Sequence, residues 1–162
     1  TGCSRSPGPS GWTEELLSYA ANHPRANEAL AAMTLDILNG NVSALTKQQL
    51  TQSRLVGIPK PGGGTRPIAI GECITKLAGS YALQAAGPEL RKQLEPIQRG
   101  LSQSGCEEII HAARAHLSKN PNHTLVLFDC KNAFNSVDRR AMASGLFSRP
   151  SLCRLWRLFG LL

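Results

Sequence analysis

Long apolar runs are missing from this chain of 162 residues. The longest, at 125–128 and 158–162, fall far short of the roughly 20 residues that a membrane-spanning helix requires, so we expect no membrane span. Charged residues are also few, at 18%, whereas hydrophobic residues make up 41%. This composition is typical neither of a coiled coil nor of a disordered chain. We therefore expect a folded globular piece about one domain long.

Paired cysteine motifs are absent as well. The five cysteines are scattered at positions 3, 73, 106, 130 and 153, and no two form a C-x-x-C pair, which argues against a zinc ribbon and against a disulfide framework. We expect an intracellular location, with the nucleus as one candidate compartment. The chain starts at Thr1 without a secretory signal pattern, and we expect it to be part of a longer protein.

Several catalytic signatures are also missing. No Lys-Ser or Lys-Thr follows Gly57-x-x-x-x-Gly62, and Pro67 stands where a G-x-G-x-x-G motif needs its third glycine, which disfavours a P-loop hydrolase. The histidines form no H-E-x-x-H pair, and we interpret all four as surface residues: His23, His111, His116 and His123. Ser104 lies in no G-x-S-x-G elbow, so a hydrolase triad has no nucleophile.

Positive charge is in excess and unevenly distributed. The net charge is +7, of which residues 1–81 carry +2 and residues 82–162 carry +5. Such an excess attracts polyanions through counterion release and favours nucleic acid as a partner. Solvated basic surfaces without such a partner are the other interpretation.

Local patterns predict a mixture of helices and strands, typical of an α+β fold. A hairpin is expected over 54–70, where two β-prone runs flank a Pro- and Gly-rich connection. Helices are expected at 13–22, 24–39, 72–86 and 104–118, with Gly87 and Pro88 ending the third and a Ser104–Glu107 capping box starting the fourth. Asp138 is expected to cap a helix that follows it, and Pro150 to begin the last one.

The apolar run 123–129 predicts a buried central strand that ends at Asp129. A carboxylate at the end of such a strand can bind a hard cation such as Mg²⁺; the alternative is that Asp129 only forms an Asx turn. Lys60 and Arg66 flank three glycines in the hairpin connection, which suits a polyphosphate ligand. The alternative is a solvated hairpin tip with incidental charges.

Four blocks of the chain, in this order, resemble the fingers and early palm of reverse transcriptases of the non-LTR retrotransposon type. They are 6–17, 53–83, 95–117 and 124–142, which includes FDCKNAF. The resemblance implies a right-hand polymerase fragment with the fingers at 1–122 and a partial palm at 123–162, truncated before the hairpin that carries the Asp-Asp pair. It also implies RNA-templated DNA synthesis by two-metal nucleotidyl transfer, with Mg²⁺ as cofactor.

The same resemblance implies roles for individual residues. Asp129 would be the first metal-binding aspartate, with the backbone carbonyl of Cys130 beside it. Asn132 and Ala133 would line the nucleotide pocket, and Phe134 would lie under the incoming sugar.

The remaining implied roles lie earlier in the chain. Lys60 and Arg66 would hold the triphosphate, while Gln98, Arg99 and Gly100 would lie beside the template. Expected partners are an RNA template, a DNA or RNA primer and deoxynucleoside triphosphates. Because the chain lacks the downstream Asp-Asp pair, we expect it to be an inactive fragment; the alternative is a noncatalytic nucleic-acid-binding remnant of a mobile element.

Overall fold

The computed structural model describes residues 6–95, 97–130 and 133–161. It divides into two compact units, one formed by Thr1–Gln84 with Cys153–Leu162 and the other by Ala85–Leu152. We call them unit 1 and unit 2; the division falls inside helix α4 (Cys73–Leu94). No described helix is both long enough and apolar enough to span a bilayer.

Unit 1 contains the helices expected at 13–22 and 24–39, and also a helix at 44–51 that was not predicted. Thr13 and Ser43 act as N-caps, because their hydroxyls accept hydrogen bonds from Leu16 N at 3.2 Å and Thr46 N at 3.1 Å. Gly40 ends the second helix with a φ of 69°, a conformation that glycine adopts without strain. The helices are α1 (Glu14–Ala21), α2 (Pro24–Asn39), α3 (Ala44–Thr51), the first part of α4, and α8 (Trp156–Leu161).

Small residues on α4 form the centre of the unit 1 core. Ala78 is fully buried, and Ala82 is 5% exposed, so neighbouring side chains can approach the α4 backbone closely. Ile37 of α2, only 2% exposed, belongs to the same cluster. The cluster is completed by Leu50, Leu158 and Leu161.

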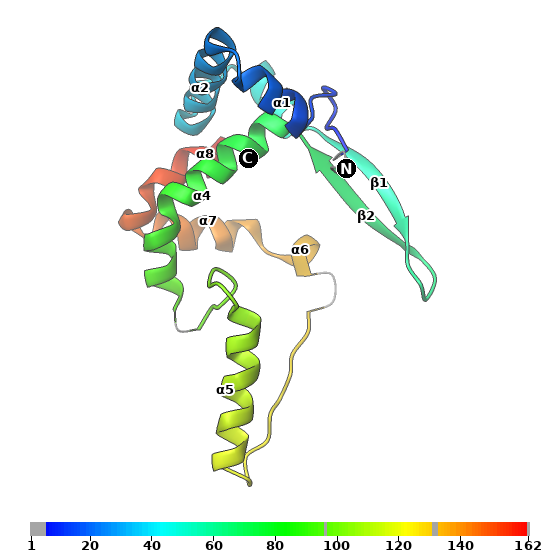
Figure 1. Cartoon of the computed structure of the whole chain (residues 1–162), viewed down its shortest axis with the longest axis vertical. Coiled ribbons are helices and arrows are strands. Elements are labelled where there is room, and N and C mark those ends of the chain that lie inside the picture. The colour runs from blue at the N-terminus through cyan, green and yellow to red at the C-terminus, as the bar shows by residue number, and fades with distance from the viewer. Residues whose placement is uncertain (1–5, 96, 131–132, 162) are drawn as a thin grey trace. The chain divides into compact units, whose positions relative to one another are not determined.

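The hairpin predicted at 54–70 is confirmed. Strands β1 (Ser53–Pro59) and β2 (Thr65–Gly71) pair antiparallel, with Arg54 opposite Ile70 and Ile58 opposite Arg66. In Figure 1 the two strands form a twisted ribbon that projects away from the helices of unit 1. Among the described residues, it is the only sheet.

The chain before α1 is fastened to the end of β2. Glu72 is 6% exposed, and its carboxylate accepts hydrogen bonds from both Ser10 N, at 2.8 Å, and Ser10 Oγ. Gly8 lies so close that an added Cβ would stand 2.8 Å from the carbonyl oxygen of Gly71. A glycine is therefore required at this approach.

The described residues of unit 2 contain the rest of α4, three further helices and the first half of a short 3₁₀ segment. These are α5 (Gly105–Lys119), α6 (Ala133–Ser136), α7 (Arg139–Phe147) and η1 (Pro150–Leu155), whose last residues belong to unit 1. Asp138 caps α7 as predicted, since its Oδ1 accepts from Arg140 N at 2.8 Å.

Two predictions about helix ends were wrong. Helix α4 continues through Gly87 and Pro88 to Leu94, although proline removes one backbone hydrogen bond from a helix interior. Ser104 precedes α5 but forms no capping bond through its side chain. Its φ of 57° and ψ of 25° are left-handed, whereas a capping serine needs an extended backbone.

The buried central strand predicted at 123–129 was also wrong. Residues 123–130 form neither helix nor strand, and all are exposed, with Leu127 at 84% and Phe128 at 92%. Figure 1 shows this segment as an extended stretch that follows α5. A central strand needs a neighbour on each side, and the two described strands pair with each other.

Candidate functional site

Two of the three cations of the hairpin, Lys60 and Arg66, lie at its tip. Arg66 stands on β2 opposite Ile58, and Lys60 is the first residue after β1. Both residues are exposed. An anion at the tip of the ribbon could therefore contact both cations.

The tip between these cations is held by backbone hydrogen bonds. Lys60 N donates to Gly64 O at 3.1 Å, and Gly63 N donates to Lys60 O at 3.1 Å. Gly63 and Gly64 have φ values of 89° and 83°, which only glycine adopts without strain. The glycines that suggested close approach of a ligand thus also have a structural role.

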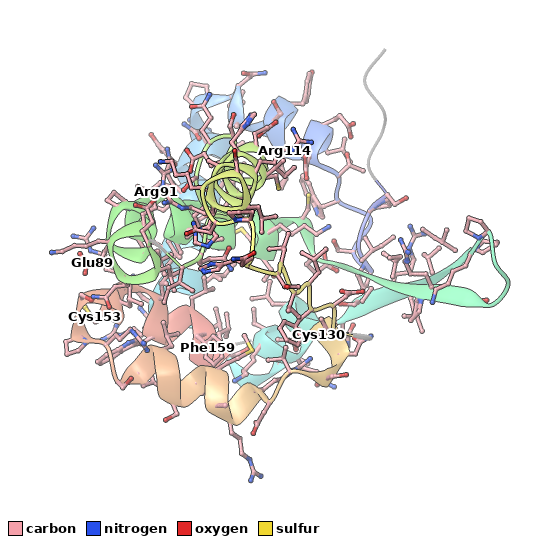
Figure 2. The ribbon with its side chains drawn as sticks, turned by 90° about the horizontal axis from the view of Figure 1, so that it is seen from below. Glu89, Arg91, Arg114, Cys130, Cys153 and Phe159 are labelled. Atoms are coloured by element: carbon pink, nitrogen blue, oxygen red, sulfur yellow. The ribbon has the colours of Figure 1, made fainter. Side chains whose placement is uncertain are left out.

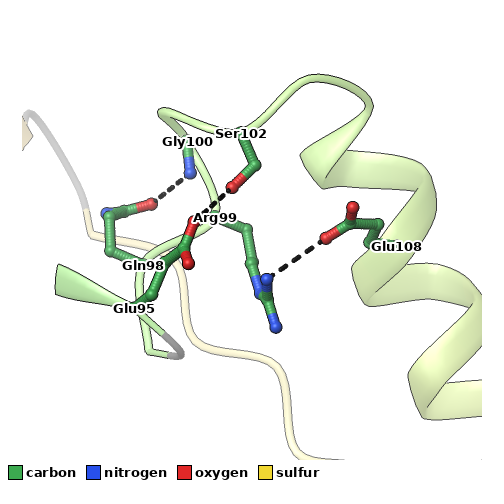
Figure 3. A network of polar contacts seen from close by, with 6 residues as sticks. All are labelled: Glu95, Gln98, Arg99, Gly100, Ser102 and Glu108. Atoms are coloured by element: carbon green, nitrogen blue, oxygen red, sulfur yellow. Dashed lines mark hydrogen bonds and ion pairs between the residues drawn. The ribbon is translucent and has the colours of Figure 1, made fainter. Parts of the chain in front are cut away.

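The residues predicted to lie beside a template form a compact loop before α5, shown in Figure 3. Gln98 Oε1 accepts a hydrogen bond from Gly100 N at 2.7 Å, and Ser102 Oγ donates to Glu95 Oε1 at 3.1 Å. An ion pair joins Arg99 Nη1 to Glu108 Oε2 at 3.4 Å. The loop is therefore ordered by its own side chains, and its three predicted residues lie together.

Arg99 is only partly available to a ligand. Its side chain is 34% exposed and that of Glu108 is 50% exposed. A surface pair of this kind contributes about 0–1 kcal/mol in water, so a phosphate could displace the carboxylate at little cost. Exposed Arg91 and Arg114 add positive charge to unit 2, on α4 and α5 (Figure 2).

Asp129 and Cys130 lie in the exposed segment before α6. Ala133 is the first residue of α6 and is also exposed. Asn132 lies outside the described residues, as does the side chain of Phe134. Asp129 is therefore open to solvent, but the strand expected to orient its carboxylate is not formed.

The predicted site residues fall into separate groups. Lys60 and Arg66 belong to unit 1, whereas the loop at 98–100 and Asp129 belong to unit 2. Within the described part of the chain, no three His, Cys, Asp or Glu side chains gather closely enough to hold a metal ion. One carboxylate oxygen of Asp138, Oδ1, accepts the N-cap bonds of α7.

Sequence reasoning missed an apolar groove in unit 1. The groove has a volume of about 850 Å³ and lies among α1, α2 and α4, lined by residues that include Leu30, Leu35 and Leu77. It also contains Cys73, whose thiol pKa is raised by burial and, secondarily, by the negative charge of Glu14. The available signal is the apolar spacing along these helices, which ordinary core packing produces equally well.

The sequence was compared with known proteins. No family model matches the chain, and no solved structure gives a significant match. The chain is 32% identical, over 156 residues, to the retrotransposable element SLACS 132 kDa protein of Trypanosoma brucei gambiense. The match covers 96% of this chain but only 13% of that protein. The chain is therefore similar along nearly its whole length to one short stretch of a retrotransposon protein.

Proposed function

We propose that this chain is the fingers and early palm part of a reverse transcriptase domain of the non-LTR retrotransposon type. The whole domain would copy RNA into DNA by nucleotidyl transfer. This chain would bind the incoming deoxynucleotide and the template, but would not catalyse synthesis by itself. The observation that carries the proposal is the 32% identity to a retrotransposon protein over 96% of the chain.

The hairpin supports the nucleotide-binding part of the proposal. A triphosphate is a compact polyanion, and Lys60 and Arg66 are both exposed at the tip of the ribbon. Lysine offers a mobile point charge, whereas arginine offers a planar fork that pairs with two phosphate oxygens. Together they suit a nucleotide whose phosphates lie at that tip.

The template-binding part is supported by the ordered loop at 98–100. The backbone N–H of Gly100 is already used by Gln98, so an RNA strand would meet the Gln98 amide nitrogen and the Arg99 guanidinium. Unit 2 contains nine Lys and Arg against six Asp and Glu. Phosphate contacts of this kind give affinity that falls steeply with salt.

Magnesium is implied by nucleotidyl transfer, where it would stabilise negative charge on the transferred phosphate. The described residues fit this requirement incompletely. Asp129 supplies one exposed carboxylate, whereas a pair of ions needs several. The proposal therefore assigns catalysis to the complete domain and binding alone to this chain.

A second candidate function is that of a noncatalytic nucleic-acid-binding remnant of a mobile element. The exposed, irregular backbone around Asp129 favours it, because a catalytic carboxylate normally needs a rigid platform. The two functions differ in nucleotide recognition. Only a polymerase part needs to bind a deoxynucleoside triphosphate at the hairpin cations.

The test is a binding experiment on the 162-residue chain. A fluorescent RNA template annealed to a DNA primer is titrated at several salt concentrations, and a fluorescent deoxynucleoside triphosphate is titrated with Mg²⁺. We expect both to bind, with the logarithm of RNA affinity falling by about 0.7–0.9 per phosphate contact for each tenfold rise in salt. We expect no primer extension.

Matched variants locate the nucleotide. Lys60→Gln and Arg66→Gln should each weaken triphosphate binding about tenfold, the effect of losing roughly 1.4 kcal/mol. Arg54→Gln is the control, because Arg54 is exposed on the same ribbon at its other end. Equal effects of all three variants, or triphosphate binding that none of them changes, would refute the nucleotide site. RNA binding without triphosphate binding would favour the noncatalytic remnant.

A further inference from the structure

Two histidine rings meet at the C-terminal end of α5. His116 Nε2 and His123 Nδ1 are 2.9 Å apart, within hydrogen-bonding distance. The ring centroids are 5.1 Å apart, and the ring planes are tilted by 43°. Both residues are exposed, and neither has a role in the proposed polymerase function.

The chain between the two histidines is held in a fixed turn. Asn120 N and Asn120 Nδ2 donate to His116 O at 3.0 and 2.9 Å, and His123 N donates to Asn120 O at 2.9 Å. These three bonds tie the segment back onto the last turn of α5. The backbones that carry the rings are therefore positioned before any ligand arrives.

The two ring nitrogens are close enough to share one metal ion. Imidazole nitrogens at about 2.0–2.1 Å from one ion lie about 2.9–3.3 Å apart, depending on the coordination geometry. The two nitrogens are 2.9 Å apart because the rings are hydrogen-bonded to each other, so a small rotation of each ring brings both nitrogens to one ion. We propose that His116 and His123 form a binding site for a divalent transition-metal ion that accepts imidazole ligands, of the Ni²⁺ or Cu²⁺ kind.

Metal binding replaces the hydrogen bond between the two histidine rings. In the free protein one ring donates its N–H to the other. Before both nitrogens can bind the ion, the donor ring must release the proton on that nitrogen and take one up on its other nitrogen, so that it stays neutral as the other tautomer. Each ring then turns so that its lone pair aims at the metal, and solvent exposure leaves room for this movement. Competition with protons makes the site weaker at acidic pH.

The surroundings add both favourable and unfavourable charge. The C-terminal end of a helix carries partial negative charge, which favours a cation, whereas Lys119 in the same last turn opposes it. No third His, Cys, Asp or Glu completes the site within the described ranges. Water or a small external ligand would therefore fill the remaining positions.

The experiment uses Ni²⁺ as the probe and the ring-proton NMR signals of histidine as the readout. Paramagnetic Ni²⁺ at low stoichiometry should broaden the signals of two histidines ahead of the others. His116→Asn and His123→Asn should each weaken Ni²⁺ binding, measured by calorimetry, about tenfold or more. The cysteine thiols contribute no histidine signal, so they cannot mimic the NMR result.

His111→Asn is the matched control. His111 is an exposed histidine on the same helix, outside the pair, and its loss should leave the affinity unchanged. Circular dichroism checks that each variant keeps its helices. Ni²⁺ affinity that is insensitive to both pair variants, or equally sensitive to the control, would overturn the proposal. RNA and triphosphate binding need not change, so this site and the proposed function can fail separately.

Discussion

The two hydrogen bonds between Ser10 and Glu72 predict how much the free energy of unfolding falls when one of them is removed. Ser10→Ala removes the hydroxyl donor to Glu72 Oε2 and keeps the backbone donor to Oε1. Hydrogen bonds to charged groups contribute about 1.5–3 kcal/mol. Because this bond is only partly buried, we expect a loss of about 1.5–2 kcal/mol, near the lower end of that range.

Urea unfolding followed by tryptophan fluorescence measures this loss. Both tryptophans, Trp12 and Trp156, belong to unit 1, as do Ser10 and Glu72. The fluorescence signal therefore reports on the unfolding of the unit that contains the hydrogen bond. With an m-value of about 2 kcal/mol/M, the midpoint should fall by about 0.8–1 M. Ser18→Ala, an exposed serine on α1, should shift stability by no more than about 0.5 kcal/mol.

A double-mutant cycle decides whether the hydrogen bond is the cause. Glu72→Gln keeps the shape of the side chain but removes its charge, so Ser10→Ala should cost less in that background. An unchanged midpoint in Ser10→Ala would contradict the reasoning. So would equal losses in the two backgrounds, because the serine would then act without the carboxylate.

Three further predictions concern other parts of the chain. Iodoacetamide at neutral pH should label Cys106, which is exposed, well before Cys73, whose burial and raised thiol pKa both oppose reaction; mass spectrometry measures the order. A hydrogen bond from Gln93, assisted by one from Ser151, lowers the pKa of Glu89. The ionised Glu89 carboxylate therefore stabilises the fold above the usual glutamate pKa, and this contribution is lost as the pH falls through the lowered pKa of Glu89. Gln93→Ala should raise this pKa in a carboxyl NMR titration, and no change would refute the assignment. Pro88→Ala should raise the thermal unfolding temperature by restoring up to about 3 kcal/mol of helix stability, and an unchanged or lower temperature would contradict this reasoning.

Local signals in the sequence predicted local structure well. The helices expected at 13–22 and 24–39 and the cap at Asp138 depend on a few neighbouring residues, and all three were confirmed. The hairpin was predicted for the same reason, because its glycine-rich tip and its two β-prone runs are adjacent in the chain.

Features that depend on distant residues could not be predicted in this way. The run at 123–129 has the composition of a buried strand, but burial and pairing need partners that composition does not specify. The contact between His116 and His123 depends on how the chain turns after α5. No sequence motif predicts that turn. The apolar run before Asp129 likewise identified this residue as a candidate, but the sequence did not predict which residues would surround it.

The exposed run Leu125–Phe128 also affects how the chain behaves at high concentration. Four consecutive apolar residues lie exposed and outside the two described strands. Such short, uncharged, proline-free segments are the kind that stack between molecules into cross-β aggregates. Val126→Lys would place a charge in the middle of the run and should keep the purified protein dispersed at concentrations where the unmodified chain precipitates.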